Sequence, residues 1–187
     1  MLTTKAGDVE VEFLNEDGNE MRVNMGKADF MSACIPVEGV SCEQELVNEP
    51  LRFHGTLYNT TCLSVGNPHC VIMTEDVSCK SAKALGPYVE NAPYFPNRMN
   101  LQLCRVKARD CLRVETYERG AGYTMASGTG ACAAAAAAYR LGLVENRVTV
   151  EMPGGTLWIE IGADGDIYMT GSVEKVGTFV LAEDFFS

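Results

Sequence analysis

Basic side chains are scarce in this chain of 187 residues, which has 15 lysines and arginines against 25 aspartates and glutamates. The net charge of −10 repels phosphate backbones, which argues against nucleic acid as a partner. Long apolar runs are also missing: no stretch approaches the roughly 18 residues that span a bilayer. Residues 1–7 lack the apolar core of a signal peptide. We therefore expect a cytoplasmic protein without a membrane partner.

Close cysteine pairs are absent as well. The eight cysteines form no Cys-x-x-Cys pair, and only His54 and His69 could assist a metal, so we expect no metal site. Most of the cysteines are flanked by apolar residues, which predicts buried thiols in a reducing compartment. They are Cys34, Cys42, Cys62, Cys70, Cys79, Cys104, Cys111 and Cys132.

No repeat or linker divides the chain, and its length allows one compact domain or two small lobes. Apolar residues make up 47% and charged residues 21%. This ordinary globular composition excludes a disordered, collagen-like or coiled-coil chain.

Alternating apolar and polar residues predict a β-hairpin over the first 25 residues, with its turn at 15–18. Residues 26–50 predict a connector with one short strand at most. A helix is predicted over 79–91, capped by Ser78 and broken near Gly86-Pro87. Further strands are predicted over 56–65, 69–74, 99–107, 111–118, 147–152, 155–161, 166–173 and 176–182, with a turn at 163–165.

An alanine-rich segment predicts a second helix over 130–141, ended by Gly142. A helix that is small and apolar on every side is buried and closely surrounded. We expect the strands to wrap it like a partial barrel. The fold class is therefore a strand-rich α+β fold.

The densest signal for chemistry is the segment 117–132, where a strand ends in Glu118 and Arg119 and a glycine loop opens into the alanine helix. Unpaired amides and the macrodipole make the start of a helix an anion site, and Gly128 and Gly130 allow close approach to the backbone. The loop contains no lysine and lacks a phosphate-loop pattern, so a carboxylate suits it better. A tight turn without a ligand is the alternative.

A second signal is the sequence Gly66-Asn67-Pro68-His69. Pro68 holds Asn67 and His69 in defined directions, so Asn67 could bind an amino or carboxylate group and His69 could transfer protons. A turn with a satisfied histidine is the alternative. A dyad of His69 with Cys70 is disfavoured because adjacent strand residues point to opposite faces. A weaker signal is the segment 95–100, where Asn100 opens a strand.

Together these segments resemble the diaminopimelate epimerase family. Its Gly-Asn-Pro-His, Phe-Pro-x-Arg-x-Asn, Glu-Arg-Gly-Ala-Gly and Cys-Gly-Thr-Gly-Ala-Cys motifs correspond, in order, to residues 66–69, 95–100, 118–122 and 127–132. The resemblance implies two pseudo-symmetric lobes, each a barrel-like wrap about a helix. It also implies catalysis without pyridoxal phosphate, metal or another cofactor, on a diamino dicarboxylic acid in lysine and cell-wall precursor synthesis.

The family's reaction inverts an α-carbon, so one group removes a proton from one face and another group returns a proton to the other face. By resemblance, position 127 carries a catalytic group, supported by His69 and Glu118. Gly128 and Thr129 would bind the α-carboxylate. The non-reacting amino-acid end would be held by Asn67, Asn100, Glu118 and Arg119.

The sequence departs from the family at two places. Ser127 replaces the loop cysteine, and a hydroxyl is a far weaker acid than a thiol. Cys132 lies about one helical turn further on and does not substitute for it. The family's first lobe, with its own catalytic cysteine, is largely missing, so we expect impaired activity.

We expect three regions: residues 1–27 as remnant strands of the first lobe, 28–172 as the C-terminal lobe, and 173–187 as a strand returning to the first lobe. Their exposed edges predict a homodimer or a swapped assembly. Two alternatives to an impaired epimerase stay open. One is a related racemase or isomerase acting on another amino acid, and the other is a non-catalytic amino-acid-binding or assembly protein.

Overall fold

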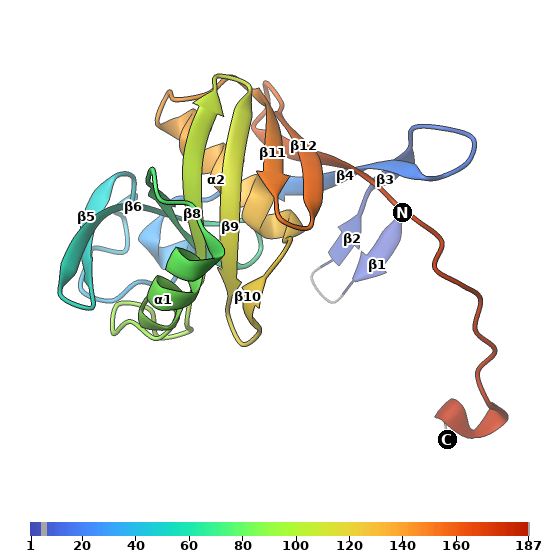
Figure 1. Cartoon of the computed structure of the whole chain (residues 1–187), viewed down its shortest axis with the longest axis horizontal. Coiled ribbons are helices and arrows are strands. Elements are labelled where there is room, and N and C mark those ends of the chain that lie inside the picture. Colours follow the sequence, from blue (N-terminus) through green and yellow to red (C-terminus); the bar gives the residue numbers. More distant parts are fainter. Residues whose placement is uncertain (5–6, 187) are drawn as a thin grey trace.

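The computed structural model describes residues 1–4 and 7–186, which form a long mixed sheet and two α-helices (Figure 1). Helix α1 spans Cys79–Glu90, and helix α2 spans Gly128–Arg140. Short 3-10 helices cover Ser32–Cys34 and Glu183–Phe186. The strands are β1 (Leu2–Thr4), β2 (Gly7–Val9), β3 (Val11–Phe13), β4 (Glu20–Lys27), β5 (Glu49–Phe53), β6 (Thr56–Ser64), β7 (Pro68–Met73), β8 (Asn100–Ala108), β9 (Cys111–Glu118), β10 (Gly122–Thr124), β11 (Arg147–Met152), β12 (Gly155–Ile161) and β13 (Asp166–Ser172).

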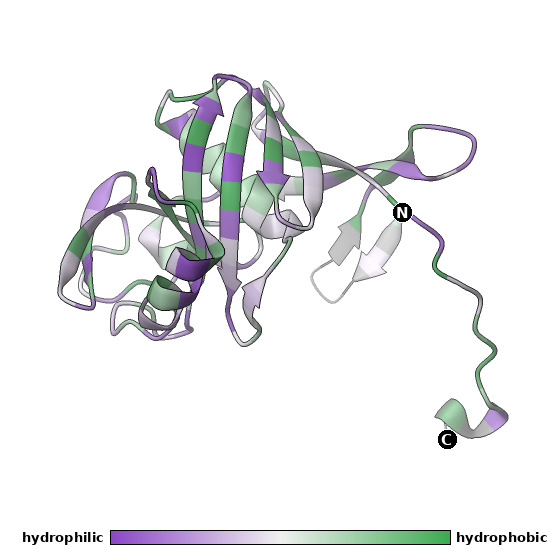
Figure 2. Cartoon of the chain, in the orientation of Figure 1, coloured by the Kyte–Doolittle hydropathy of each residue, from purple (hydrophilic) through white to green (hydrophobic). Residues whose placement is uncertain are grey.

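The main sheet has the strand order β3-β4-β13-β12-β11-β9-β8-β7-β6-β5, and β10 pairs with β9 beside this path. Its pairs are antiparallel except for β7 with β8 and β9 with β11, which are parallel. Hydrophobic and hydrophilic bands alternate along β8 and β9, as expected for strands with unlike faces (Figure 2). A mixed sheet with few helices confirms the predicted α+β class.

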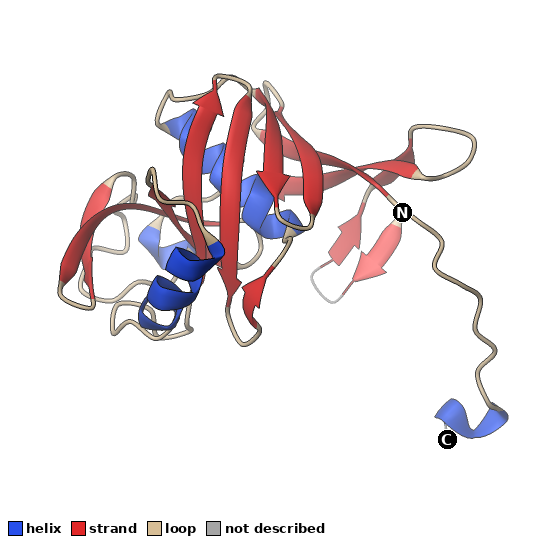
Figure 3. Ribbon diagram, in the orientation of Figure 1, coloured by secondary structure: helices blue, strands red, loops and turns tan. Residues whose placement is uncertain are grey.

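Helix α2 lies at the centre of the curved sheet, behind β8, β9 and β11 in the view of Figure 3. It contacts β6, β7, β8, β9, β11, β12 and β13, and residues 131–138 are all at most 4% exposed. Alanine side chains allow this enclosure because they let strands approach from every side. The predicted wrap is confirmed. The helix begins two residues earlier than predicted, at Gly128, because the Ser127 side chain caps it by accepting from the Gly130 amide.

Helix α1 packs against β8 and β9, and Ser78 caps it as predicted, accepting a hydrogen bond from the Ser81 amide. The predicted break near Gly86-Pro87 is wrong, since the helix continues through Pro87 to Glu90. Pro87 lies in the last turn, where the lost amide removes one hydrogen bond only. Gly86 is required for packing: a Cβ atom there would lie 2.1 Å from Cγ of Tyr117.

The hairpin predicted over the first 25 residues is formed by β3 and β4, which pair Val11 with Val23 and Phe13 with Met21. Strands β1 and β2 make an additional hairpin that alternation did not separate from it. The connector of residues 26–50 carries a 3-10 helix and the start of β5. Within the described residues, no helix is long and apolar enough to cross a membrane.

The strand predicted over 176–182 is wrong. Residues 173–182 run away from the sheet, as the end of the chain in Figure 1 shows, and Val173 donates its amide to the Asn19 carbonyl. A strand forms only beside a partner that accepts and donates its backbone hydrogen bonds, and no strand of the described chain lies beside this segment. Val176, Phe179 and Val180 are therefore 94%, 83% and 96% exposed.

All eight cysteines are free, and four of them, Cys62, Cys70, Cys104 and Cys132, are buried as predicted. The prediction is wrong for Cys34 and Cys42, which are exposed because they lie in the connector rather than in strands. Burial raises the pKa of the Cys132 thiol to about 12. Cys132 therefore stays protonated inside the core.

Candidate functional site

The sequence motifs meet at one end of three neighbouring interior strands, where β7 and β8 begin and β9 ends. His69 is the register neighbour of Asn100 on the parallel strand β8, and Leu101 faces Tyr117 on β9. Glu118 therefore ends β9 beside Asn100. A hydrogen bond from Asn67 to Thr129 connects the start of helix α2 to this end of the strands.

Ser127 connects the end of β9 to the start of helix α2. Its hydroxyl donates to Oε1 of Glu118 at 2.9 Å and accepts from the Gly130 amide at 3.1 Å. Ser127 is 7% exposed, and the two hydrogen bonds hold its side chain in place. Ser127 is consequently both the N-cap of the helix and the partner of a carboxylate.

The next two residues leave helix amides open to a ligand. Within the described part of the chain, the amides of Gly128 and Thr129 make no hydrogen bond, and both residues are partly exposed. A Cβ atom at Gly128 would lie 3.1 Å from Sδ of Met169, so a side chain there would be crowded. Open amides at the positive end of a long helix can bind a carboxylate.

His69 and Asn67 extend the hydrogen-bonded chain from Thr129 into the protein. Asn67 Nδ2 donates to Thr129 Oγ1 at 3.3 Å, and Asn67 Oδ1 lies 2.9 Å from His69 Nε2. On its other side, His69 Nδ1 lies 3.1 Å from Gln102 Oε1. Burial lowers the pKa of His69 to about 4, so the imidazole is neutral at pH 7. Cys70 points to the opposite face, into the core beside Cys62, as alternation predicted.

Asn100 binds the backbone on both sides of the site. Its Nδ2 donates to the Pro68 carbonyl at 2.8 Å, and its Oδ1 accepts from the Arg119 amide at 2.8 Å. The Arg119 guanidinium donates to the Asn97 carbonyl at 2.9 Å and is otherwise directed toward solvent. Asn100 thus fixes the relative positions of the two motifs, and Arg119 lies at the rim.

Two further residues support the site and were not predicted. Glu90, 7% exposed, accepts from the Gly120 amide at 2.8 Å and from Arg98, and so braces the turn after Arg119. Gln102 is fully buried against His69. Alternation could have indicated Gln102, a polar residue on the face of Asn100 in an apolar strand. Glu90 carries no such signal, because the contact depends on how α1 packs.

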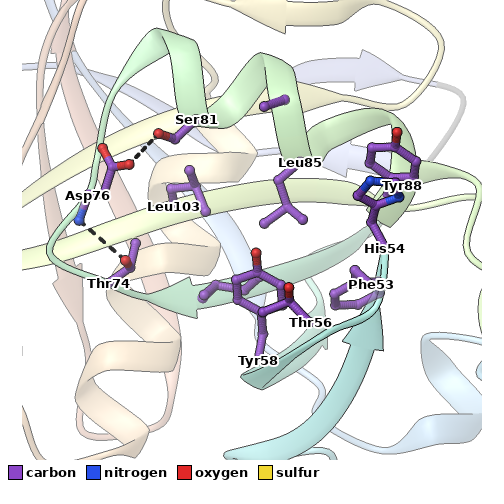
Figure 4. Close-up of a pocket in the computed structure, with 12 residues that line it drawn as sticks. Phe53, His54, Thr56, Tyr58, Thr74, Asp76, Ser81, Leu85, Tyr88 and Leu103 are labelled. Atoms are coloured by element: carbon purple, nitrogen blue, oxygen red, sulfur yellow. Dashed lines mark hydrogen bonds between the residues drawn. The ribbon is translucent and has the colours of Figure 1, made fainter.

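An apolar pocket lies away from this site and is shown in Figure 4. It has a volume of about 410 Å³ and lies between α1 and the β5–β6 hairpin, with the rings of Phe53, Tyr58 and Tyr88 among its walls. Leu103 lines it from β8, on the face opposite Gln102. The pocket therefore shares no residue with the site. Among the described residues, no three His, Cys, Asp or Glu side chains are gathered to hold a metal.

Solved structures identify the fold as that of amino-acid racemases and epimerases. A probable proline racemase from Agrobacterium radiobacter superposes with a TM-score of 0.68 at 15% identity, over 98% of this chain and 60% of that chain. A hydroxyproline epimerase from Agrobacterium vitis gives 0.66 at 14% identity, over 92% of this chain and 56% of that one.

Sequence comparison defines the family. The profile of the diaminopimelate epimerase family matches residues 61–176, and the chain belongs to this family. Diaminopimelate epimerase 2 of Nostoc sp. is 39% identical over 97% of this chain, and the diaminopimelate epimerase of Moorella thermoacetica is 40% identical over 94%. The chain spans 63% of the length of each of these two relatives.

Proposed function

We propose that this chain binds LL- and meso-2,6-diaminopimelate at the start of helix α2 and acts as an isomerase whose proton transfer is impaired at Ser127. The observation that carries the proposal is that hydrogen bonds connect three of the four motifs, through Ser127 with Glu118 and through Asn67 with Thr129. The names of the relatives supply the substrate class.

The α-carboxylate of the ligand would bind to the amides of Gly128 and Thr129. These amides point out of a helix of 13 residues, whose macrodipole favours an anion at that end. The same dipole stabilises the charge that develops on the carboxylate when the α-proton leaves. No cofactor is invoked in this step.

Proton transfer on this face would fall to Ser127 and Glu118. A thiol at position 127 could be ionised near neutral pH by the helix end, whereas a hydroxyl keeps its proton. Glu118 accepts that proton in a hydrogen bond at 2.9 Å, but a carboxylate is a weak base toward an α-carbon. We therefore expect slow exchange of the α-proton rather than full epimerase turnover.

The non-reacting end of the ligand would be held by the polar groups at the rim. Arg119 would pair with the distal carboxylate, and Glu118 with the ammonium group, because these contacts match in charge and geometry. Asn67 and Asn100 would orient them. His69, neutral and buried, would support Asn67 rather than exchange protons itself.

A second candidate is a binding or assembly protein without catalysis, and the specific observation that favours it is Ser127. The two candidates predict the same ligand but differ in what happens to its α-proton. A racemase acting on a cyclic amino acid is the third candidate, and the Glu118-Arg119 pair argues for the diamino dicarboxylate instead.

We further propose that residues 1–27 and 173–187 are completed by another chain, in a homodimer or swapped assembly, around the lobe of residues 28–172. The support is the exposure of Phe179 and Val180 in a segment that pairs with no strand among the described residues. An exposed apolar segment of this kind, which also includes Val176 and Leu181, marks a protein interaction site.

The deciding experiment is α-proton exchange in deuterated water. LL- and meso-diaminopimelate are followed by proton NMR with the protein in large excess over contaminating enzyme. Loss of the α-proton signal supports the impaired isomerase and contradicts the purely non-catalytic candidate. Binding without exchange supports the non-catalytic candidate. Exchange of proline in place of diaminopimelate would overturn both.

A further inference from the structure

Gln102 lies behind His69 and has an unusual environment for an amide side chain. It is 0% exposed, and its oxygen Oε1 lies 3.1 Å from His69 Nδ1. Its nitrogen Nε2 is buried and has no hydrogen-bond partner among the described residues. A buried amide nitrogen without an acceptor is destabilising, so its placement requires an explanation.

The imidazole of His69 faces an oxygen on each side. Nδ1 faces Gln102 Oε1 at 3.1 Å, and Nε2 faces Asn67 Oδ1 at 2.9 Å. A neutral imidazole has one N–H and one lone pair, so it cannot donate to both oxygens. Burial keeps the ring neutral, since its pKa is lowered to about 4. One of the two amides must therefore present its nitrogen to His69.

The unpartnered nitrogen of Gln102 decides which amide this is, because the Thr129 hydroxyl can donate as well as accept and so fits either orientation of Asn67. Asn67 uses Nδ2 to donate to Thr129 Oγ1, which directs its oxygen at His69. His69 must then carry its proton on Nε2, and Nδ1 becomes an acceptor that needs a donor. The Gln102 nitrogen supplies one after a half-turn about one bond, in which the oxygen and nitrogen of the carboxamide exchange places. The half-turn also gives the unpartnered nitrogen its acceptor.

We propose that Gln102 is a positioning residue that donates to His69, fixes its Nε2–H tautomer and thereby orients the Asn67 amide toward the start of helix α2. Gly130 makes room for this arrangement of side chains. Before the half-turn, a Cβ atom there would lie 3.1 Å from Gln102 Nε2, so glycine leaves the room that the carboxamide occupies. The hydrogen bonds then run in one direction, from Gln102 to His69, from His69 to Asn67 and from Asn67 to Thr129.

The tautomer can be read directly because the chain has only two histidines, His54 and His69. In protein labelled with nitrogen-15 in histidine, long-range proton–nitrogen correlation NMR distinguishes a protonated ring nitrogen from one with a lone pair. We expect His69 to show a protonated Nε2 and an unprotonated Nδ1 throughout pH 6–8, with exposed His54 as internal reference. A protonated Nδ1 in the wild-type chain overturns the proposal.

Two variants test the direction of the bond. Gln102→Glu presents only acceptor atoms when its carboxyl group is ionised, so His69 should then carry its proton on Nδ1 and the Asn67 amide should turn over. Gln102→Met keeps the volume without a donor, and we expect a mixture of tautomers. It also carries the test if the buried carboxylate prevents folding. Gln44→Glu, in the connector, is the matched control and should leave the spectrum unchanged. An unchanged Nε2–H tautomer in folded Gln102→Met contradicts the role of Gln102.

The effect on a ligand rests on the proposed function, and it is measured separately. Titration with meso-diaminopimelate should give about tenfold weaker binding for Gln102→Met, the loss expected when one hydrogen bond no longer orients Asn67. Absence of binding by the wild-type chain would refute the proposed function, and the tautomer pattern would still decide the role of Gln102. Unaltered binding together with mixed tautomers would show that Asn67 is oriented without Gln102.

Discussion

The hydroxyl group of Ser127 makes two hydrogen bonds, one as acceptor and one as donor. As N-cap it satisfies the Gly130 amide, and as donor it holds Glu118, so the loop geometry survives without a thiol. Cysteine fills nearly the same volume but accepts hydrogen bonds weakly. At position 127, serine therefore favours capping of the helix, whereas cysteine favours an acidic side chain. Substitutions can separate these two properties.

We predict that Ser127→Cys accelerates α-proton exchange of meso-diaminopimelate by about 10²-fold or more, because a thiolate becomes available as the base. Proton NMR in deuterated water measures the rate. Ser127→Ala, which has neither thiol nor hydroxyl, is the control and should stay at or below the wild-type rate. Equal rates in Ser127→Cys and wild type would place the base elsewhere.

A second prediction concerns His69 and pH. Its pKa in the folded state, about 4, lies below the value of about 6.5 in the unfolded chain, so the unfolded state binds more protons between these values. The contribution of His69 to the free energy of unfolding should be fully present above about pH 6.5. It should decline as the pH falls toward 4, by at most about 3 kcal/mol. Urea unfolding across this range measures the decline. His69→Gln should lack it, and His54→Gln should retain it; a pH dependence common to all three chains would assign it to other groups.

At the scale of elements, helix α2 depends on the small size of its side chains. Ala135 is fully enclosed by the strands around it. Ala135→Leu should lower the free energy of unfolding by about 1–3 kcal/mol or more, because the close-packed core has no room for the added atoms. Ala84→Leu on the exposed side of α1 is the matched control, and denaturant unfolding compares the two. Similar free energies of unfolding for the two variants would show that the strands move apart to accommodate the larger side chain on α2.

Alternation predicts best the strands with one buried and one more open face, such as β11. Its residues Val148, Val150 and Met152 are buried on one side, and burial of one side fixes the register of a strand. Residues 176–182 show where this reasoning ends: apolar content predicts a strand, but a strand also needs a neighbour, which the local sequence cannot specify. Pro87 shows the opposite error: a proline predicts a helix break, but in the last turn of α1 it does not end the helix.

The candidate site was predictable in its motifs and only partly in its contacts. The glycine loop and Asn67 were visible because turns and helix starts have strong local signals. The bond between Ser127 and Glu118 follows from the approach of β9 to α2, which is a tertiary property. Alternation could have placed Gln102 on the face of Asn100, but its contact with His69 depends on the pairing of β7 with β8, which the local sequence does not specify.

At the scale of the whole molecule, the exposed segment 173–182 predicts self-association. Light scattering coupled to size-exclusion chromatography at micromolar concentration should give a dimer or larger species, because burial of Phe179 and Val180 removes apolar surface from water. Phe179→Asp combined with Val180→Asp should shift the protein toward the monomer. Leu57→Asp, also on an exposed apolar residue, is the control and should not. A monomeric wild-type chain would exclude the proposed assembly.

The pairing of β4 with β13 has a consequence for how the chain reaches its fold. Val23 is placed opposite Met169, a residue 146 positions later. During synthesis, at 5–20 residues per second, the β3–β4 hairpin waits on the order of ten seconds for its neighbour to leave the ribosome. Through that interval β4 presents an open edge to the cell, and the loop that must then close takes up 146 of the 187 positions of the chain. The order of strands thus makes completion of the sheet a late event and exposes the nascent chain to capture by chaperones or by a second copy.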